Sequence, residues 1–439
     1  MPSTAAALSW PISSNPYARQ ALVASWMGWM FDGYEGYALV LVMTPAVHQV
    51  LTPDRLSSAH LYASGLLAAT MLGWAIGGVA AGVMADYLGR RRTLMLSILC
   101  YAVFAGLTAL AWGYWPLLIC RFFTGIGLGA EWGPGAAIVA ESWPARSRGR
   151  AGGVLHAAYG VGLLVASAAW ALLTPLGPSA WRFMFLIGVL PAFLLLYVRR
   201  HVDEPELWLA ANTDRREARK RLTAGNGSPQ DCATAQFTLA QVFSDPTLRR
   251  RVLLLLLMAI SSVVAFWSAS TWVPEYAAHL AANSQFSLSS AGAALLFSAG
   301  AIAGYIVLGV LADCLGRKST IWLYYLGGLI VSLCLFLVAH GRQLIPLVAA
   351  SGFFTTGQFA WMTIYLPEQF PTRVRGTAMS VVFDSSRMFA GVGPLVAAWL
   401  ISSFGGVGPA AATMSLIYVV GLIITPFAGP ETKGMPLPT

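Results

Sequence analysis

The sequence predicts an all-α membrane protein, in which twelve transmembrane helices form two six-helix, pseudo-symmetric bundles. The prediction depends on the composition and on an internal repeat. Of the 439 residues, 57% are hydrophobic and only 10% are charged, against about 25% charged residues in soluble domains. A helix that crosses a bilayer needs about 20 mostly apolar residues, so twelve of them use roughly 240 residues. This composition excludes an ordinary soluble enzyme.

Twelve apolar stretches alternate with short polar segments. Each stretch is expected to be a helix, because the sequence lacks the alternating pattern of a membrane barrel strand and bare backbone groups cannot face lipid. The stretches of the first half lie near residues 20–48, 60–85, 93–112, 115–142, 151–174 and 181–199, and those of the second half near 252–277, 288–312, 319–339, 343–367, 376–403 and 409–428.

The basic residues indicate the orientation in the membrane. The formal net charge is +9, but Lys and Arg gather in clusters between the apolar stretches, as at 90–92, 215–221 and 249–251. Nucleic-acid binding is therefore not expected, whereas cytoplasmic loops of membrane proteins are rich in Lys and Arg. A cytoplasmic N-terminus brings most of the 27 basic residues to that side. We expect both termini in the cytoplasm, in a multi-pass protein of the inner (plasma) membrane.

The two halves of the chain repeat each other. Residues 82–93 read GVMADYLGRRRT, and residues 309–320 read GVLADCLGRKST. At the same spacing, ESWPARSRGRA at 141–151 recurs as EQFPTRVRGTA at 368–378. A repeat that keeps its register in this way indicates internal duplication.

One long polar segment, residues 201–251, lies between the two halves and has no apolar periodicity. Such a segment is typical of a linker. We therefore expect an N-terminal bundle over residues 1–200, a cytoplasmic linker over 201–251 and a C-terminal bundle over 252–439.

The repeated loops resemble the major facilitator superfamily, whose hallmark is G-x-x-x-D-x-x-G-R-[KR] between helices 2 and 3 and between helices 8 and 9. Both copies are complete here, beginning at Gly82 and Gly309. FDGYEGY at 31–37 and GAEWGPGAAIVAESWPARSRG at 129–149 look most like the sialate:proton symporter branch, which includes bacterial monocarboxylate carriers. Metabolite:proton and aromatic-acid:proton symporters are close rivals. The resemblance implies a secondary transporter with a central site that alternates between the two faces.

Charged side chains inside the membrane are the first candidate functional residues. Burying an ionisable group at the bilayer centre costs about 2.5 to 3.5 kcal/mol, so such groups face a cavity or a partner. Asp32 and Glu35 are expected near the middle of the first helix, on one face at i,i+3 spacing. Two carboxylates this close disfavour joint ionisation, which suits one of them to take up a proton. The alternative is that arginines neutralise both acids and hold helices together.

Two further charged residues are candidates for the proton path. Arg121 is expected in the outer third of the fourth helix, and Glu131 about halfway along it. Arg121 is either a relay partner of the Asp32 and Glu35 carboxylates or a conformational brace, and Glu131 is either part of the relay or a buried structural contact. His156 on the fifth helix has the ordinary titration range for a relay, near pH 6.5, although a lone membrane histidine is more often a packing residue.

Arg387 is the predicted substrate anchor. It is expected near the midplane of the eleventh helix, where a guanidinium can hold a carboxylate by two parallel hydrogen bonds. Asp384 precedes it by one helical turn, so the alternative is a structural ion pair, which a substrate could displace. Further substrate contacts are expected from Tyr34, Tyr159, Gln358 and Trp361, and the other aromatic candidates for the cavity are Trp26, Trp29, Trp267, Trp272 and Tyr365.

Charged residues of the repeated loops are candidates for a gate at the cytoplasmic face. Opposite charges there can close the inner side and separate when the cavity opens inward. The alternative is that basic loops only fix the orientation. The candidates are Asp86, Arg90, Glu141 and Arg146 in the first half and Asp313, Arg317, Glu368 and Arg373 in the second.

The predicted function is transport, not enzyme catalysis. The phosphate-cradling motif G-x-x-x-x-G-K-[ST] is absent, and we expect no cofactor and no metal, with a proton gradient as the energy source. The leading hypothesis is proton-coupled import of a small organic anion, such as the monocarboxylate lactate, by a monomer in the lipid bilayer. The alternatives are a proton-coupled sugar or polyol symporter and a proton-driven exporter of amphipathic compounds.

Overall fold

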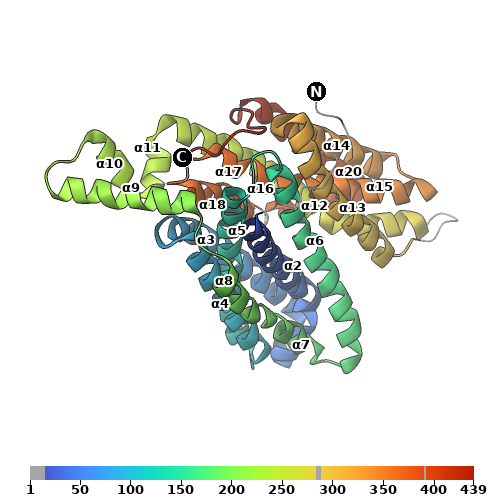
Figure 1. The fold of residues 1–439 in the computed structure, drawn as a ribbon. Helices are drawn as coiled ribbons and strands as arrows, with labels where there is room; N and C mark the ends of the chain where they lie inside the picture. The colour runs from blue at the N-terminus through green and yellow to red at the C-terminus, as the bar shows by residue number, and fades with distance from the viewer. Residues whose placement is uncertain (1–14, 283–287, 390–391) are drawn as a thin grey trace.

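The computed structural model describes residues 15–282, 288–389 and 392–439. Within these ranges, twelve helical spans cross the molecule, as the apolar stretches predict (Figure 1). The spans of the first half are α2 (Pro16–Val50), α3 (Ala59–Leu88), α4 (Arg90–Ala109), α5 (Tyr114–Ser142), α6 (Arg148–Leu173) and a sixth span made of α7 (Ala180–Ile187), η3 (Leu190–Phe193) and α8 (Leu194–His201).

The spans of the second half include three that consist of more than one helical segment. α12 (Pro246–Ala282), α13 (Ser290–Leu315) and α14 (Arg317–Leu337) come first. The tenth span consists of α15 (Leu344–Ser351), a π-helical turn η5 (Gly352–Thr356), η6 (Gly357–Phe359), α16 (Ala360–Ile364) and α17 (Leu366–Gln369). The eleventh span consists of α18 (Arg375–Ser386), η7 (Arg387–Phe389) and α19 (Val392–Phe404). The twelfth span consists of α20 (Val407–Ser415) and α21 (Tyr418–Ile424).

Eight helical segments within the described residues are long and apolar enough by themselves to cross a membrane. The four other spans are those where buried polar groups or breaks interrupt the apolar run. α2 and α5 carry buried acids and an arginine, and the tenth and eleventh spans consist of shorter helices. The continuous helices expected near 343–367 and 376–403 are therefore corrected to broken ones, with η7 beginning at Arg387.

The segment between the two halves forms three short helices, α9 (Glu206–Thr223), α10 (Pro229–Ala235) and α11 (Thr238–Ser244). They lie at one end of the molecule, which we call the linker end; the opposite end is the far end (Figure 1). Arg215 of α9 donates to the Asp86 carbonyl oxygen at 2.7 Å, and Thr238 of α11 bonds the Thr377 hydroxyl at 2.9 Å. The linker helices thus contact both halves of the molecule.

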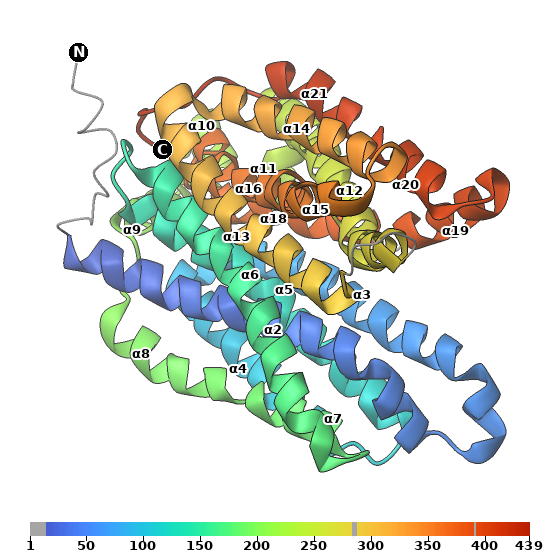
Figure 2. The same ribbon diagram turned by 90° about the vertical axis from the view of Figure 1, so that its right-hand side faces the viewer.

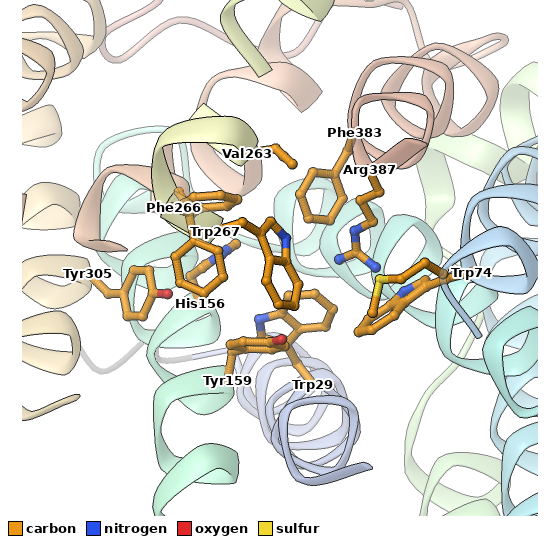
Figure 3. A pocket seen from close by; sticks show the side chains of 12 residues that line it. Trp29, Trp74, His156, Tyr159, Val263, Phe266, Trp267, Tyr305, Phe383 and Arg387 are labelled. Carbon is orange, nitrogen blue, oxygen red and sulfur yellow. The ribbon is translucent and has the colours of Figure 1, made fainter. Parts of the chain in front are cut away.

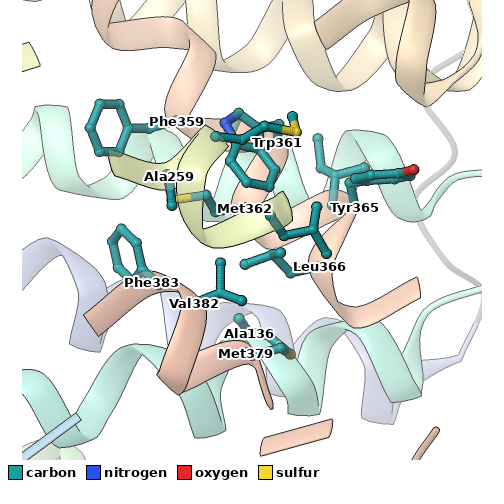
Figure 4. Packing of buried hydrophobic residues seen from close by; sticks show 14 of the residues in the cluster. Ala136, Ala259, Phe359, Trp361, Met362, Tyr365, Leu366, Met379, Val382 and Phe383 are labelled. Carbon is teal, nitrogen blue, oxygen red and sulfur yellow. The ribbon is translucent and has the colours of Figure 1, made fainter. Parts of the chain in front are cut away.

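The two bundles meet mainly along two helix pairs, α3 with α18 and α6 with α13. Figure 2 shows the first six spans, blue to green, below the last six, yellow to red. The largest apolar cluster continues across this interface (Figure 4): Ala136 of α5 lies beside Met379 and Val382 of α18, and the cluster extends to Trp361 and Tyr365. The helices of the two halves therefore share a packed core near the linker end.

Two aspartates join the bundles in a symmetric way at the linker end. The Asp86 carboxylate of α3 accepts hydrogen bonds from the backbone N–H groups of Gly376 and Thr377, at 3.0 and 2.8 Å, in the first turn of α18. The Asp313 carboxylate of α13 accepts the corresponding bonds from Gly149 and Arg150 in the first turn of α6, both at 3.0 Å. A carboxylate is favourable at a helix N-terminus because it satisfies free N–H groups and complements the helix dipole.

Two glutamates complete the closure, each between an arginine of its own bundle and one of the other. Glu141 contacts Arg90 at 3.2 Å and Arg375 at 2.6 Å. Glu368 contacts Arg317 at 2.9 Å and Arg148 at 3.1 Å. We call Asp86, Asp313 and these six residues the latch. Because the side chains of all eight are almost fully buried, the linker end is closed.

Two of the predicted gate residues do not take part in the ion pairs of the latch. Arg146 is exposed, and among the described residues the ion pairs across the interface include neither Arg146 nor Arg373. The arginines that pair are Arg148 and Arg375, two positions further along, because α6 and α18 begin at these residues. Arg373 instead offers its backbone carbonyl oxygen to Arg215.

We expect Glu141→Gln to open the linker end, because it leaves the cations of Arg90 and Arg375 buried without their shared anion. Removing one partner of a buried pair costs about 3 to 5 kcal/mol, which is roughly a hundredfold shift in equilibrium or more. Ser380 is buried in the interface beside Gly82. In a protein without its five native cysteines, thiol labelling of Ser380→Cys should be faster with Glu141→Gln and unchanged with the exposed control Arg146→Gln. Equal labelling rates in all three proteins would contradict the latch.

Candidate functional site

A cavity lies between the two bundles, beyond the latch (Figure 3). Its free volume is about 40 Å³, enough for a few water molecules, so a larger ligand requires side chains to move. A second hollow shares Tyr159, Phe266 and Tyr305 with it and continues along α2 to Tyr37, toward the far end. The lining of the first cavity is mostly aromatic: Trp29, Met71, Trp74, His156, Tyr159, Val263, Phe266, Trp267, Tyr305, Phe359, Phe383 and Arg387.

Arg387, the predicted anchor, reaches into this cavity from the start of η7 (Figure 3). Its guanidinium carbon lies 4.1 Å from the centre of the Trp74 ring and 4.2 Å from that of Phe383. A guanidinium over aromatic faces is attracted to their π electrons. Its Nη1 is buried and has no hydrogen-bond partner within the described part of the chain. The rings therefore hold the cation while one of its donor edges stays available.

Asp384 does not neutralise Arg387 as a close pair. The described residues show no contact within 4 Å between the two charges, although they are close enough to interact electrostatically. Asp384 is fully buried against α3, where a Cβ at Gly78 would lie 2.0 Å from its carboxyl carbon. The structural ion pair considered from the sequence is thus not formed in this state, and Asp384 does not line the cavity.

Glu35 is paired with Arg121. Their closest N–O distance is 3.2 Å, and both side chains are fully buried. Arg121 also donates to the hydroxyls of Thr108 and Thr124, at 3.2 and 2.8 Å, and its guanidinium lies 4.3 Å from the Phe185 ring centre. This network ties α2 to α4, α5 and α7 within the first bundle, as expected of a brace.

Asp32 has a different environment from Glu35. It is fully buried, and neither carboxylate oxygen has a hydrogen-bond partner in the described ranges. The charged groups near it are Glu131, Arg387, Asp384 and Glu35. Three of these four are acids, and burial of several anions together is unfavourable. Asp32 and Glu131 are therefore the acids of α2 and α5 that are suited to hold a proton.

The other predicted substrate contacts are placed as follows. Tyr159 lines the cavity. Tyr34 donates to the Met184 carbonyl oxygen at 2.9 Å, Gln358 to that of Thr355 at 3.0 Å, and Trp361 to the Ser262 hydroxyl at 3.2 Å. None of these three is among the lining residues, so a substrate contact for them remains a prediction.

The aromatic lining was only partly anticipated. Trp29, Trp267 and His156 were candidates and line the cavity; Trp267 stands in the middle of it in Figure 3. The side chain of Trp272 lies outside the described residues. Trp74, Phe383, Phe266, Tyr305 and Phe359 were missed. Trp74, Tyr305 and Phe383 lie one helical turn from a glycine or a charged residue, as with Phe383 before Arg387, whereas no such signal marks Phe266 or Phe359.

The arrangement can bind an anion and exchange protons. One cation held by rings faces a mostly apolar cavity, and an anion in such low-dielectric surroundings interacts with it strongly. Within the described part of the chain, no group of three or more His, Cys, Asp or Glu side chains is arranged for a metal ion.

Comparisons with known proteins agree with the predicted family. The model of the Major Facilitator Superfamily matches residues 21–341 and 276–436. A putative metabolite transport protein of Haemophilus influenzae is 33% identical, over 96% of this chain and 98% of its own length. The sialic acid transporter NanX of Escherichia coli is 25% identical, over 95% and 96%. Among solved structures, the proton:xylose symporter XylE has a TM-score of 0.74 at 20% identity, over 96% and 98%.

We expect Glu35→Gln to lower the melting temperature of the purified protein by several degrees, because Arg121 then stays buried without an anion. Asp32→Asn should melt close to the native protein, since no cation loses a close partner. The double variant Glu35→Gln with Arg121→Gln should recover part of the loss. If Asp32→Asn destabilised the protein as much as Glu35→Gln, the assignment of Glu35 as the structural acid would be wrong.

Proposed function

The chain belongs to the major facilitator superfamily, and we propose that it is a proton-coupled symporter that imports a small organic anion. It is a multi-pass membrane transporter for small molecules, not an enzyme. In the proposed cycle, the two bundles rock about the central cavity, which opens alternately to each face. With the linker end in the cytoplasm, the closed latch corresponds to an outward-facing state.

The observation that carries the proposal is the available edge of Arg387 in an aromatic cavity. A guanidinium that is held by ring faces keeps its N–H groups for a ligand, and a carboxylate matches them with two parallel hydrogen bonds. A neutral sugar does not need this charge. The second-bundle side of the cavity is therefore suited to an anion rather than to a sugar or polyol.

The walls favour a monocarboxylate with an apolar or planar body. Eight of the lining side chains are aromatic rings other than His156, and few polar groups face the cavity. An apolar wall does not satisfy the hydroxyls of a polyhydroxylated acid. We therefore place aromatic or unsaturated acids ahead of lactate and of sialic acid, although a relative is named for sialic acid.

Asp32 is the proposed proton carrier. Glu35 already has a fixed cation in Arg121, which disfavours its protonation, whereas Asp32 is surrounded mainly by acids. The positive charge of Arg387 also acts on the Asp32 carboxylate. A substrate anion bound to Arg387 offsets that charge, and this favours protonation of Asp32. Proton and anion would then bind together, as symport requires.

We expect Arg387→Gln to abolish measurable uptake of the transported acid or to raise its KM roughly thirtyfold or more, as for the loss of a buried charged hydrogen-bonding partner. The measurement is initial uptake of labelled benzoate, lactate, sialate and glucose into proteoliposomes under an inward proton gradient, with protein-free liposomes subtracted. The exposed arginine in Arg342→Gln is the matched control and should transport normally. Transport of glucose alone, or normal acid uptake by Arg387→Gln, would favour the sugar symporter instead.

For Asp32→Asn, we expect loss of accumulation driven by the proton gradient, with retained exchange of labelled internal acid for unlabelled external acid. Exchange needs no net proton movement, because the loaded carrier returns loaded. The two assays on one proteoliposome preparation separate coupling from substrate binding. Gradient-driven accumulation by Asp32→Asn at the native level would exclude Asp32 as the proton carrier.

A further inference from the structure

We propose that Trp74 is a positioning residue of the substrate site: its ring holds the Arg387 guanidinium across the bundle interface and keeps it from pairing with Asp384. Trp74 belongs to α3 of the first bundle, whereas Arg387 belongs to η7 of the second (Figure 3). The inference rests on the proposed function, because it assigns the available charge of Arg387 to a substrate carboxylate.

Trp74 has a rigid support. It is 2% exposed. The backbones of α3 and α5 are in close contact beside it: a Cβ atom added at Gly129 of α5 would lie only 1.9 Å from the Trp74 carbonyl oxygen. On another side, a Cβ at Gly36 of α2 would lie 3.3 Å from the ring. The ring cannot retreat without a shift of whole helices, so it fixes one face of the guanidinium.

The ring and the Asp384 carboxylate compete for one cation. Asp384 and Arg387 are one helical turn apart, a spacing at which opposite charges commonly pair. The guanidinium instead lies near the centres of the Trp74 and Phe383 rings, at 4.1 and 4.2 Å, and its Nη1 has no partner within the described residues. A ring contacts the face of a guanidinium and leaves its edges free, whereas a carboxylate occupies an edge. Trp74 therefore preserves the edge that a substrate needs.

Fluorination of Trp74 tests the attraction between ring and cation directly. Site-specific incorporation of tryptophans with one to four ring fluorines weakens the negative face of the ring with little change of shape. We expect the KM of labelled acid uptake to rise stepwise along the series, and Trp74→Leu to raise KM about 2- to 30-fold, with a smaller effect on the maximal rate. Trp181, whose ring lies 4.3 Å from the Arg182 guanidinium away from the cavity, is the matched control, where fluorination should leave KM unchanged.

A double variant tests the competition with Asp384. If Trp74→Leu lets Arg387 pair with Asp384, then adding Asp384→Asn removes the competing anion and should restore much of the lost affinity. A KM that stays constant along the fluorine series, or a double variant no better than Trp74→Leu, would overturn the positioning role alone. Normal acid uptake by Arg387→Gln would overturn the proposed function, and this inference with it.

Discussion

A carboxylate of one bundle that caps a helix of the other is the interaction on which the rest of the structure depends. Asp86 binds the first turn of α18 and Asp313 the first turn of α6. An arginine of the repeated loop holds each aspartate in place: Arg90 Nη1 lies 2.9 Å from Asp86 Oδ1, and Arg317 Nη1 lies 2.8 Å from Asp313 Oδ1. Because these carboxylates bind backbone N–H groups, any rocking of the bundles must break them at both helix ends together. The cavity lies beyond these contacts, which hold the linker end shut.

The buried charges of the membrane region divide into those that have a partner and those that do not. The latch residues and the pair of Glu35 with Arg121 are neutralised at short distance. Asp32 lacks such a partner among the described residues, and Arg387 contacts aromatic rings. An ionisable group without a close partner is costly in the membrane. Binding a ligand or a proton can offset this cost. We therefore assign function to Asp32 and Arg387 rather than to Glu35 and Arg121, which neutralise each other.

Apolar length, the repeat and the loop motif were sufficient to predict the twelve spans and their family, because backbone groups in lipid allow few alternatives to helices. The sequence could not decide which of two nearby residues acts. Arg148 begins α6 and pairs across the interface, whereas Arg146, two positions earlier, does not. Of the two acids of the first span, Arg121 pairs with Glu35 and not with Asp32. The break at Arg387 and the ring of Trp74 over its guanidinium depend on packing between helices distant in the chain, so no local pattern could reveal them.

The internal repeat separates what must be symmetric from what need not be. At the spacing that matches Gly82 with Gly309, the latch residues correspond to one another: Asp86 to Asp313, Arg90 to Arg317, Glu141 to Glu368 and Arg148 to Arg375. Closing one end of two equivalent bundles requires equal contacts on both sides. The residues assigned to protons and to the anion have no like partner in the other half, since Asp32 matches Ala259, Glu131 matches Gln358, Trp74 matches Ala301 and Arg387 matches Gly160. Duplication supplied a symmetric latch, and divergence placed Asp32 and Glu131 in the first bundle and the proposed anion-binding cation, Arg387, in the second. In the proposed mechanism, the proton binds to the first bundle and the anion to the second, so their joint transport is linked to the movement of one bundle against the other.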